Sequence, residues 1–195
     1  MMSLSEIRAY LTRLRPYLIA SVVFFGVGFA IALMIVNRFP QMAESFETSL
    51  ASFVKNFRGL PKFGLFAAIF INNTLKTLLA ILLGTVFAVL PTFFLIVNGM
   101  ALGVVMSLST QSRGLWQSLL SVLPHGVIEL SAVFLGTASG IMLGVSVLGK
   151  LFRKRPMKFT AELSQSFKFF YNVIVPLLFV AALVEAYVTA ELATR

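Results

Sequence analysis

Long apolar runs dominate the chain and alternate with short polar segments. The first run, residues 17–36, matches one bilayer crossing, because a helix rises 1.5 Å per residue and the hydrocarbon core is about 30 Å thick. The stretch 63–108 would form a rod of roughly 69 Å. It is therefore expected to cross twice, turning near Gly84.

The next run, residues 118–148, would reach roughly 46 Å, too long for one crossing and too short for two. Pro124 is a natural place to break it, because proline removes a helical hydrogen bond. We predict a short half-helix before Pro124, a full span after it, and a last crossing near the C-terminus. The predicted spans of this single all-α domain are 17–36, 63–83, 85–108, 118–148 (broken at 124) and 169–189.

Three shorter segments carry apolar residues on one helical face only, which predicts amphipathic helices. We expect these helices to lie in the headgroup plane or to pack against the ends of the bundle. Their apolar positions are Leu4, Ile7, Leu11 and Leu14; then Met42, Phe46, Leu50, Phe53 and Phe57; then Phe159, Leu163, Phe167 and Phe170.

Composition supports a multi-pass membrane protein. Hydrophobic residues make up 58% of the chain and charged residues only 12%, about half the share usual in soluble domains. Cysteine is absent, which excludes disulfides and thiolate chemistry. No cofactor is expected.

The net charge of +9 results from 16 Lys and Arg residues against seven acidic residues. Most of the Lys and Arg residues lie just outside the apolar runs. No basic stripe with interleaved aromatics points to nucleic acid. The N-terminal segment and the 149–168 connection hold nine of these bases, against six in the other loops, so a cytoplasmic N-terminus in the plasma membrane is predicted. The expected partners are the bilayer, anionic lipid headgroups at Arg153, Lys154 and Arg155, and either other proteins or further copies of this chain.

The segment LPHGVIEL, residues 123–130, brings the only histidine, His125, and Glu129 into an apolar run. The two lie one helical turn apart on the same face. Glycines continue that face, and small residues let a neighbouring backbone approach closely. The stripe is therefore predicted to face protein, packing within the chain being favoured over a dimer seam. The predicted packing glycines are Gly84, Gly99, Gly103, Gly136, Gly140 and Gly144.

Polar residues in the second and third spans suggest what this stripe meets. A charged residue at mid-membrane costs about 2.5–3.5 kcal/mol on insertion scales, so Lys76 and Glu129 are expected to have partners. We predict that Lys76, or the pair Asn72 and Asn73, meets Glu129 across the bundle. The predicted polar cluster is Asn72, Asn73, Lys76, Asn98, His125 and Glu129.

Several interpretations of the chemistry of this cluster are possible from the residues. His125 is predicted to cap or hydrogen-bond at the broken helix, with a proton or ion pathway as an alternative. A metal site is disfavoured, because His125 and Glu129 supply only two ligands. Enzymatic activity is not expected, since no second carboxylate shares the segment and no serine lies in a nucleophile elbow. Glu185, near the end of the last span, is given no role.

Four features together resemble the stage II sporulation protein M family: FINN at 70–73, the small-residue hairpin at Gly84, NGMALG at 98–103, and LPHGVIEL followed by glycines. The resemblance covers most of residues 60–150. It implies a membrane protein of about five spans, whose sporulation namesake is a scaffold that recruits peptidoglycan-degrading proteins. The positions that match the family's motif are Asn72, Asn73, His125, Gly126 and Glu129.

Two functions follow as hypotheses. The first is a non-enzymatic membrane scaffold that recruits or organises partners. The second is a small transporter or channel, with the polar cluster as a mid-membrane site. A dry glycine stripe would favour the scaffold, and a water-filled route to Glu129 would favour transport.

Overall fold

The computed structural model describes residues 1–39, 41, 45, 48–49, 59–86, 88–153 and 159–189. The predicted amphipathic segment 42–57 falls almost entirely outside these residues, as do Lys154 and Arg155. Apart from turns and short connections, the described chain is helical. Its longer elements are α1 (Leu4–Arg38), α3 (Lys62–Leu83), α4 (Val89–Arg113), α5 (Leu115–Arg153), α6 (Phe159–Phe169), η1 (Phe170–Ile174), α7 (Val175–Val184) and η2 (Glu185–Thr189).

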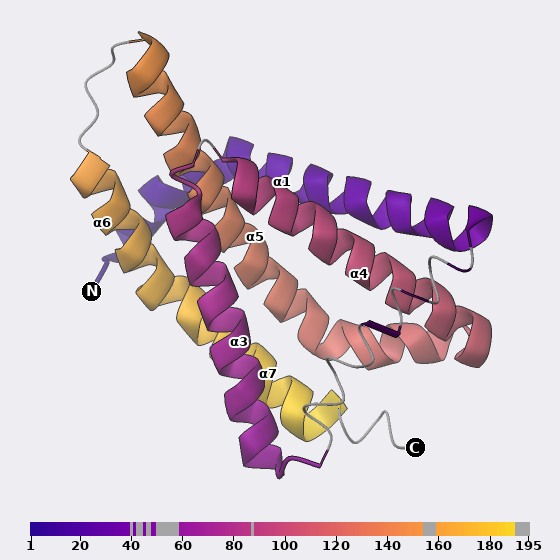
Figure 1. The fold of residues 1–195 in the computed structure, drawn as a ribbon. Helices are drawn as coiled ribbons and strands as arrows, with labels where there is room; N and C mark the ends of the chain where they lie inside the picture. The colour runs from indigo at the N-terminus through magenta and orange to yellow at the C-terminus, as the bar shows by residue number, and fades with distance from the viewer. Residues whose placement is uncertain are drawn as a thin grey trace.

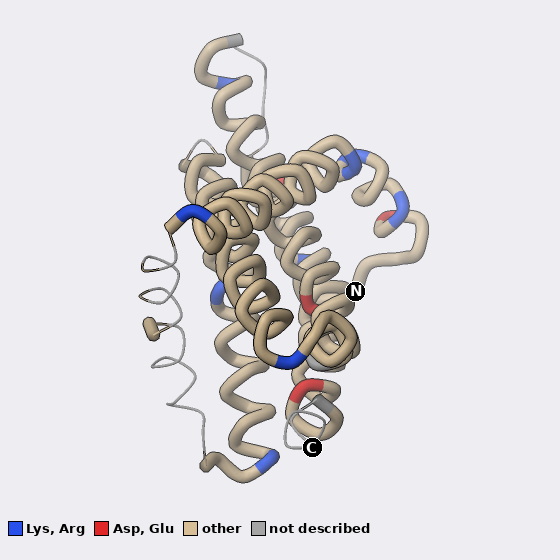
Figure 2. The backbone as a smooth tube through the Cα atoms, turned by 90° about the vertical axis from the view of Figure 1, so that its right-hand side faces the viewer, with Lys and Arg blue, Asp and Glu red and all other residues tan. Residues whose placement is uncertain are grey.

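Five of the described helical stretches are long and apolar enough to cross a membrane, which confirms the predicted all-α bundle. They are Leu4–Arg38, Lys62–Leu83, Val89–Arg113, Val122–Phe152 and Phe159–Val188. Figure 1 shows α1 beside α4 and α3 beside α7, with α5 passing between the two pairs. Lysines and arginines gather mainly towards the ends of the helices (Figure 2).

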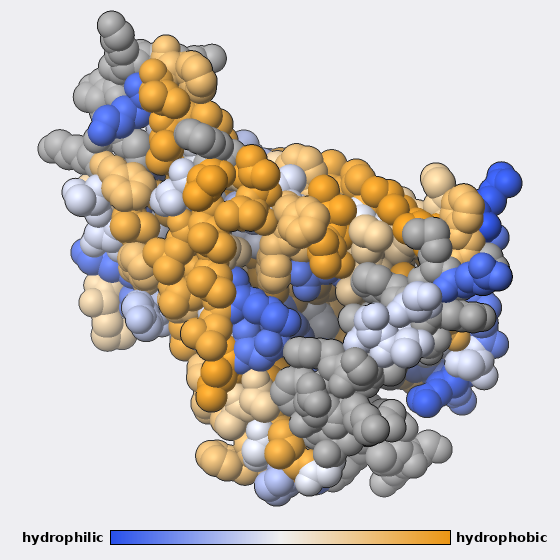
Figure 3. All heavy atoms as spheres, viewed as in Figure 1, coloured by the Kyte–Doolittle hydropathy of each residue, from blue (hydrophilic) through white to orange (hydrophobic). Residues whose placement is uncertain are grey.

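The centre of the bundle is α5, which contacts each of the other spans. Of its most apolar window, 61% is buried inside the protein, against 17–33% in the other four spans. The outer spans instead expose large apolar side chains, for example Ile19, Val23 and Val27 along α1. The visible surface in Figure 3 is accordingly hydrophobic over much of its area. This distribution suits a protein whose outer helices face lipid.

Glycines allow α5 to approach α3 until the two backbones touch. A Cβ on Gly140 would overlap the carbonyl oxygen of Ala80, and one on Gly84 would overlap the backbone of Gly140. Gly144 lies against the turn at Ala88, where α3 connects to α4. The stripe on α5 therefore packs within the chain, against Ala80 and Gly84 at the end of the second span.

A second close contact joins α1 and α4. Gly28 lies against the backbone of Ile96, and Gly99 lies against the backbone of Phe25. One turn further on, Gly103 meets Phe29 and Ala32 of α1. Membrane helices pack in this way because, without water to drive association, close van der Waals contact must supply the attraction.

The predicted break at Pro124 does not occur. Residues 115–153 form one helix that contains the proline, and Figure 1 shows that this helix changes direction in its first half. Proline removes one backbone hydrogen bond and crowds the preceding turn, which bends a helix. Leaving the helix altogether would strip further backbone groups of their partners in an apolar region, so a bend is the cheaper solution.

The first and last spans also extend beyond their predicted bounds. The N-terminal amphipathic segment and the first span form one helix, α1, which includes Pro16. The last span continues directly from α6 and contains a wide π-helical turn, η1, just before Pro176. The ring of Pro176 would crowd the carbonyl group of Asn172, and the wider turn accommodates it.

Candidate intramembrane polar site

Asn73 of α3 and Glu129 of α5 face each other beside the glycine contact. The side-chain amide of Asn73 donates a hydrogen bond of 2.9 Å to Oε1 of Glu129. The amide of Asn72 in turn donates to Oδ1 of Asn73, at 3.2 Å. The side chains of all three residues are half-buried. This is the contact between the second span and Glu129 that the sequence predicted.

Lys76 lies one turn along α3 from Asn72 and Asn73, and its charge interacts with that of Glu129. Its side chain is exposed at the surface of the bundle. A long lysine stem can cover apolar surface while its ammonium group reaches polar neighbours. Lys76 thus supplies a countercharge to the carboxylate from the rim of the cluster.

Glu185, for which the sequence predicts no role, joins this cluster from the last span. One ligand atom each from His125, Glu129 and Glu185 lies within 4.8 Å of the other two. Glu185 is the first residue of the π-helical turn η2, and π-turns recur at functional sites. Only its ionisable character within an apolar run could have drawn attention to it, because the spacing of residues in one helix does not reveal how another helix is rotated.

The side chain of Asn98 forms its hydrogen bond within its own helix and not with these residues. Its amide donates to the carbonyl oxygen of Phe94, within α4, at 2.7 Å. The neighbouring Gly99 packs against α1. Five of the six residues of the predicted cluster, Asn98 excepted, are therefore on α3 and α5, and Glu185 is added from η2.

The cluster adjoins a tightly packed part of the core. Thr77, one turn beyond Asn73, is fully buried, and its methyl group fills the space left by Gly136. The site itself, with half-buried His125, Glu129 and Glu185, is less enclosed. Figure 3 shows hydrophilic atoms gathered beside α3 on an otherwise largely hydrophobic face. The imidazole and the two carboxyl groups are thus partly exposed beside a tightly packed helix contact.

Chemically, the cluster combines two carboxylates, one imidazole, one ammonium group and two amides. Carboxylates and imidazole bind protons and cations, whereas the amides orient them by hydrogen bonds. The arrangement is suited to holding a positive charge between helices.

The comparisons with known proteins identify the group to which this architecture belongs. The profile described as stage II sporulation protein M matches residues 21–190. The chain belongs to the stage II sporulation protein M family. The match includes every residue of the polar cluster, from Asn72 to Glu185, whereas the first turns of α1 precede it.

A relative within this family comes from an archaeon. The chain is 28% identical over 179 residues to an uncharacterized protein of Methanocaldococcus jannaschii, covering 91% of this chain and 96% of the relative. The similarity extends over nearly the whole length of both proteins. No solved structure matches.

Proposed function

We propose that this member of the stage II sporulation protein M family is a non-enzymatic scaffold of the plasma membrane that presents a fixed surface to protein partners. The observation that carries this proposal is a pair of helical segments, joined by side-chain hydrogen bonds, that lie outside the most apolar parts of the spans. We call it the interfacial layer and define it as residues 4–15 of α1 together with residues 159–168 of α6.

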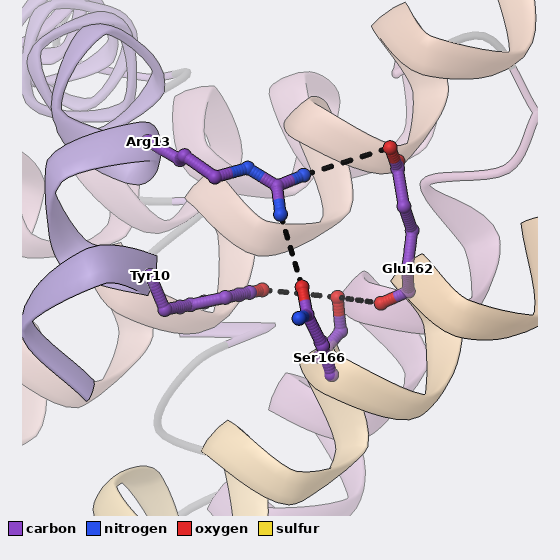
Figure 4. Close-up of polar contacts among 5 residues, drawn as sticks. Tyr10, Arg13, Glu162 and Ser166 are labelled. Atoms are coloured by element: carbon purple, nitrogen blue, oxygen red, sulfur yellow. Dashed lines mark hydrogen bonds and ion pairs between the residues drawn. The ribbon is translucent and has the colours of Figure 1, made fainter. Parts of the chain in front are cut away.

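Polar side chains fix the two halves of the interfacial layer to each other (Figure 4). The hydroxyl groups of Tyr10 and Ser166 are 2.9 Å apart in a buried hydrogen bond, and Ser166 also donates to the carbonyl oxygen of Glu162. Arg13 donates to Oε1 of Gln165 at 2.9 Å and forms a 3.5 Å ion pair with Glu162. The exposed ion pair contributes little stability on its own, so the buried hydrogen bond is the main polar contact between the two halves.

Apolar contacts anchor the same layer to the bundle. The ring of Tyr10 packs on that of Phe169, with centroids 4.5 Å apart. Leu14 is fully buried, and Ile7 packs against the same core cluster. Leu4, on the predicted apolar face, is instead 79% exposed. An ordered surface of this kind is what recruitment of a partner needs, because little entropy is lost in ordering it on binding.

Charge supports placing the interfacial layer on the cytoplasmic side. It holds four basic residues and two acidic ones, and basic residues favour the cytoplasmic side of a membrane. The C-terminal end of α5, with exposed Leu151 and Phe152, extends on the same side as α6 (Figure 1). Arg153, Lys154 and Arg155 follow in the sequence, and we propose that they bind anionic lipid headgroups.

Site-specific photo-cross-linking in native membranes tests the scaffold. A photoreactive amino acid at exposed Thr12 or Ser164 should give discrete adducts with a partner protein, whereas the same residue at Val23 on the outer face of α1 should not. The adducts should disappear when Tyr10→Ala loosens the layer. Lack of protein adducts at both layer positions, or identical adducts from Val23, would refute the proposal.

Transport is the second candidate, because ionisable groups from three helices meet in the cluster: Lys76 of α3, Glu129 of α5 and Glu185 of η2. In transporters such groups mark ion pathways. Proteoliposomes that contain wild type or Glu129→Gln distinguish the two functions. Ion flux that the wild type supports and the variant loses would establish transport; equal leakage from both and from empty liposomes would exclude it for the ions tested.

A further inference from the structure

From the convergence of His125, Glu129 and Glu185, we infer a binding site for one divalent transition-metal ion between α5 and the last span. On the sequence alone a metal site is disfavoured, because His125 and Glu129 provide only two ligands. Glu185 supplies the third. This inference is independent of the scaffold proposal, since a metal-bound bundle can serve either function.

The spacing of the donor atoms fits a metal ion after small side-chain movements. All three lie within 4.8 Å of one another. Bonds of about 2.1 Å to a tetrahedral metal place neighbouring ligand atoms about 3.4 Å apart, a distance that rotations about the flexible glutamate side chains can reach. His125 and Glu129 are already on one face of α5, one turn apart.

The donor set indicates the class of ion. One imidazole nitrogen and two carboxylate oxygens suit Zn²⁺, Mn²⁺ or Fe²⁺, whereas thiolate-preferring ions such as Cu⁺ lack their ligand in a chain without cysteine. Three protein ligands leave at least one position for water or another small ligand. The site is therefore of the open type.

Asn73 provides the supporting hydrogen bond that metal-binding carboxylates commonly have. Its amide donates to Oε1 of Glu129 at 2.9 Å, and Asn72 holds Asn73 from the other side. Such neighbours fix the orientation of a ligand and raise metal affinity. The support comes from α3, so an ion at this position would join three helices.

Charge balance gives an independent reason for a cation. When ionised, Glu129 and Glu185 carry two negative charges close together, and Lys76 offers one positive charge from the rim. Carboxylates in a membrane-spanning region are costly unless a positive charge lies close to them. A divalent ion compensates both carboxylates, and Lys76 can turn outwards on its flexible stem. The competing arrangement, in which the two carboxyl groups share a proton, would bind no metal.

Metal binding can be measured on the purified protein, with any affinity tag removed and metals stripped by EDTA. We expect wild type to bind one Co²⁺ or Zn²⁺ ion per chain, by calorimetry and by elemental mass spectrometry. Glu185→Gln keeps the size of the side chain and should weaken binding at least about 10-fold. Glu162→Gln is the matched control, since this glutamate lies in the interfacial layer, and it should bind as wild type does.

A second measurement requires no variant. Because His125 is the only histidine of the chain, its acylation by diethylpyrocarbonate can be followed by mass spectrometry without ambiguity. Saturating Zn²⁺ should slow this reaction at least about 10-fold, since a ligated nitrogen is no longer nucleophilic. Absence of stoichiometric metal, an unchanged rate of acylation with Zn²⁺, or equal affinity in Glu185→Gln would each overturn the inference.

Discussion

Replacing Gly140 with alanine tests whether the backbone contact between α3 and α5 holds the bundle together. The new Cβ would overlap the carbonyl oxygen of Ala80, and would lie 3.1 Å from its carbonyl carbon and 3.3 Å from Cα of Ile81. Ordinary Cβ contacts are 3.4–4 Å long. All three obstructing atoms are backbone atoms that no side-chain rotation can move. The helices must therefore separate by on the order of 1 Å, or distort.

The cost can be estimated by comparison with Gly26→Ala, the matched control. Gly26 is also in a helix, but a Cβ there meets nothing within 4 Å. Both variants gain the same helix propensity, about 1 kcal/mol in aqueous peptides, so their difference isolates the strain. Overpacking costs about 1–3 kcal/mol. For a chain of this length, that corresponds to a thermal midpoint lower by about 2–12 °C.

Thermal unfolding in detergent, followed by circular dichroism, provides the measurement. Gly140→Ala should unfold at a lower temperature than both wild type and Gly26→Ala. If the two alanine variants unfold at the same temperature, the close contact between α3 and α5 does not stabilise the protein. A more stable Gly140→Ala would contradict the geometry itself.

Three further predictions concern single interactions. Asn73→Ala should lower the free energy of unfolding by about 1–3 kcal/mol, because Glu129 loses its hydrogen-bond donor; an unchanged thermal midpoint would argue against the contact. Tyr10→Phe should cost about 1 kcal/mol, since the ring packing stays and only the bond to Ser166 is lost, and limited proteolysis should reveal a loosened N-terminus. Pro124→Ala should straighten α5, so that spin labels near its two ends move further apart in electron paramagnetic resonance; an unchanged distance would mean that packing, not the proline, sets the bend.

The contact between the second and fourth spans could be predicted because it depends on periodicity within each helix. Asn73, Thr77 and Gly84 share one face of the second span, and Glu129 and Gly140 share one face of the fourth. Matching two stripes of polar and small residues requires only that the helices be neighbours. The all-α bundle and the turn near Gly84 were predictable for the same reason, since length and apolarity fix where a chain crosses.

Rotation and bending between elements could not be predicted in this way. Glu185 is one polar residue in an apolar span, and nothing in its own helix shows that it faces His125. Asn98 is a polar residue of the same type as Asn72 and Asn73, but its amide bonds to the carbonyl group of Phe94 in its own helix. At Pro124, local preference favours a break, whereas the need to keep backbone groups bonded in an apolar setting keeps the helix intact.

The bond between Tyr10 and Ser166 joins α1 to α6, at the start of the last span, across 156 residues of sequence. At about 5–20 residues per second, a ribosome needs roughly 8–30 s to add that length of chain. Throughout that interval the N-terminal turns of α1 are already made, while their binding partner does not yet exist. The interfacial layer can therefore close only after the first four spans and the start of the fifth have been translated.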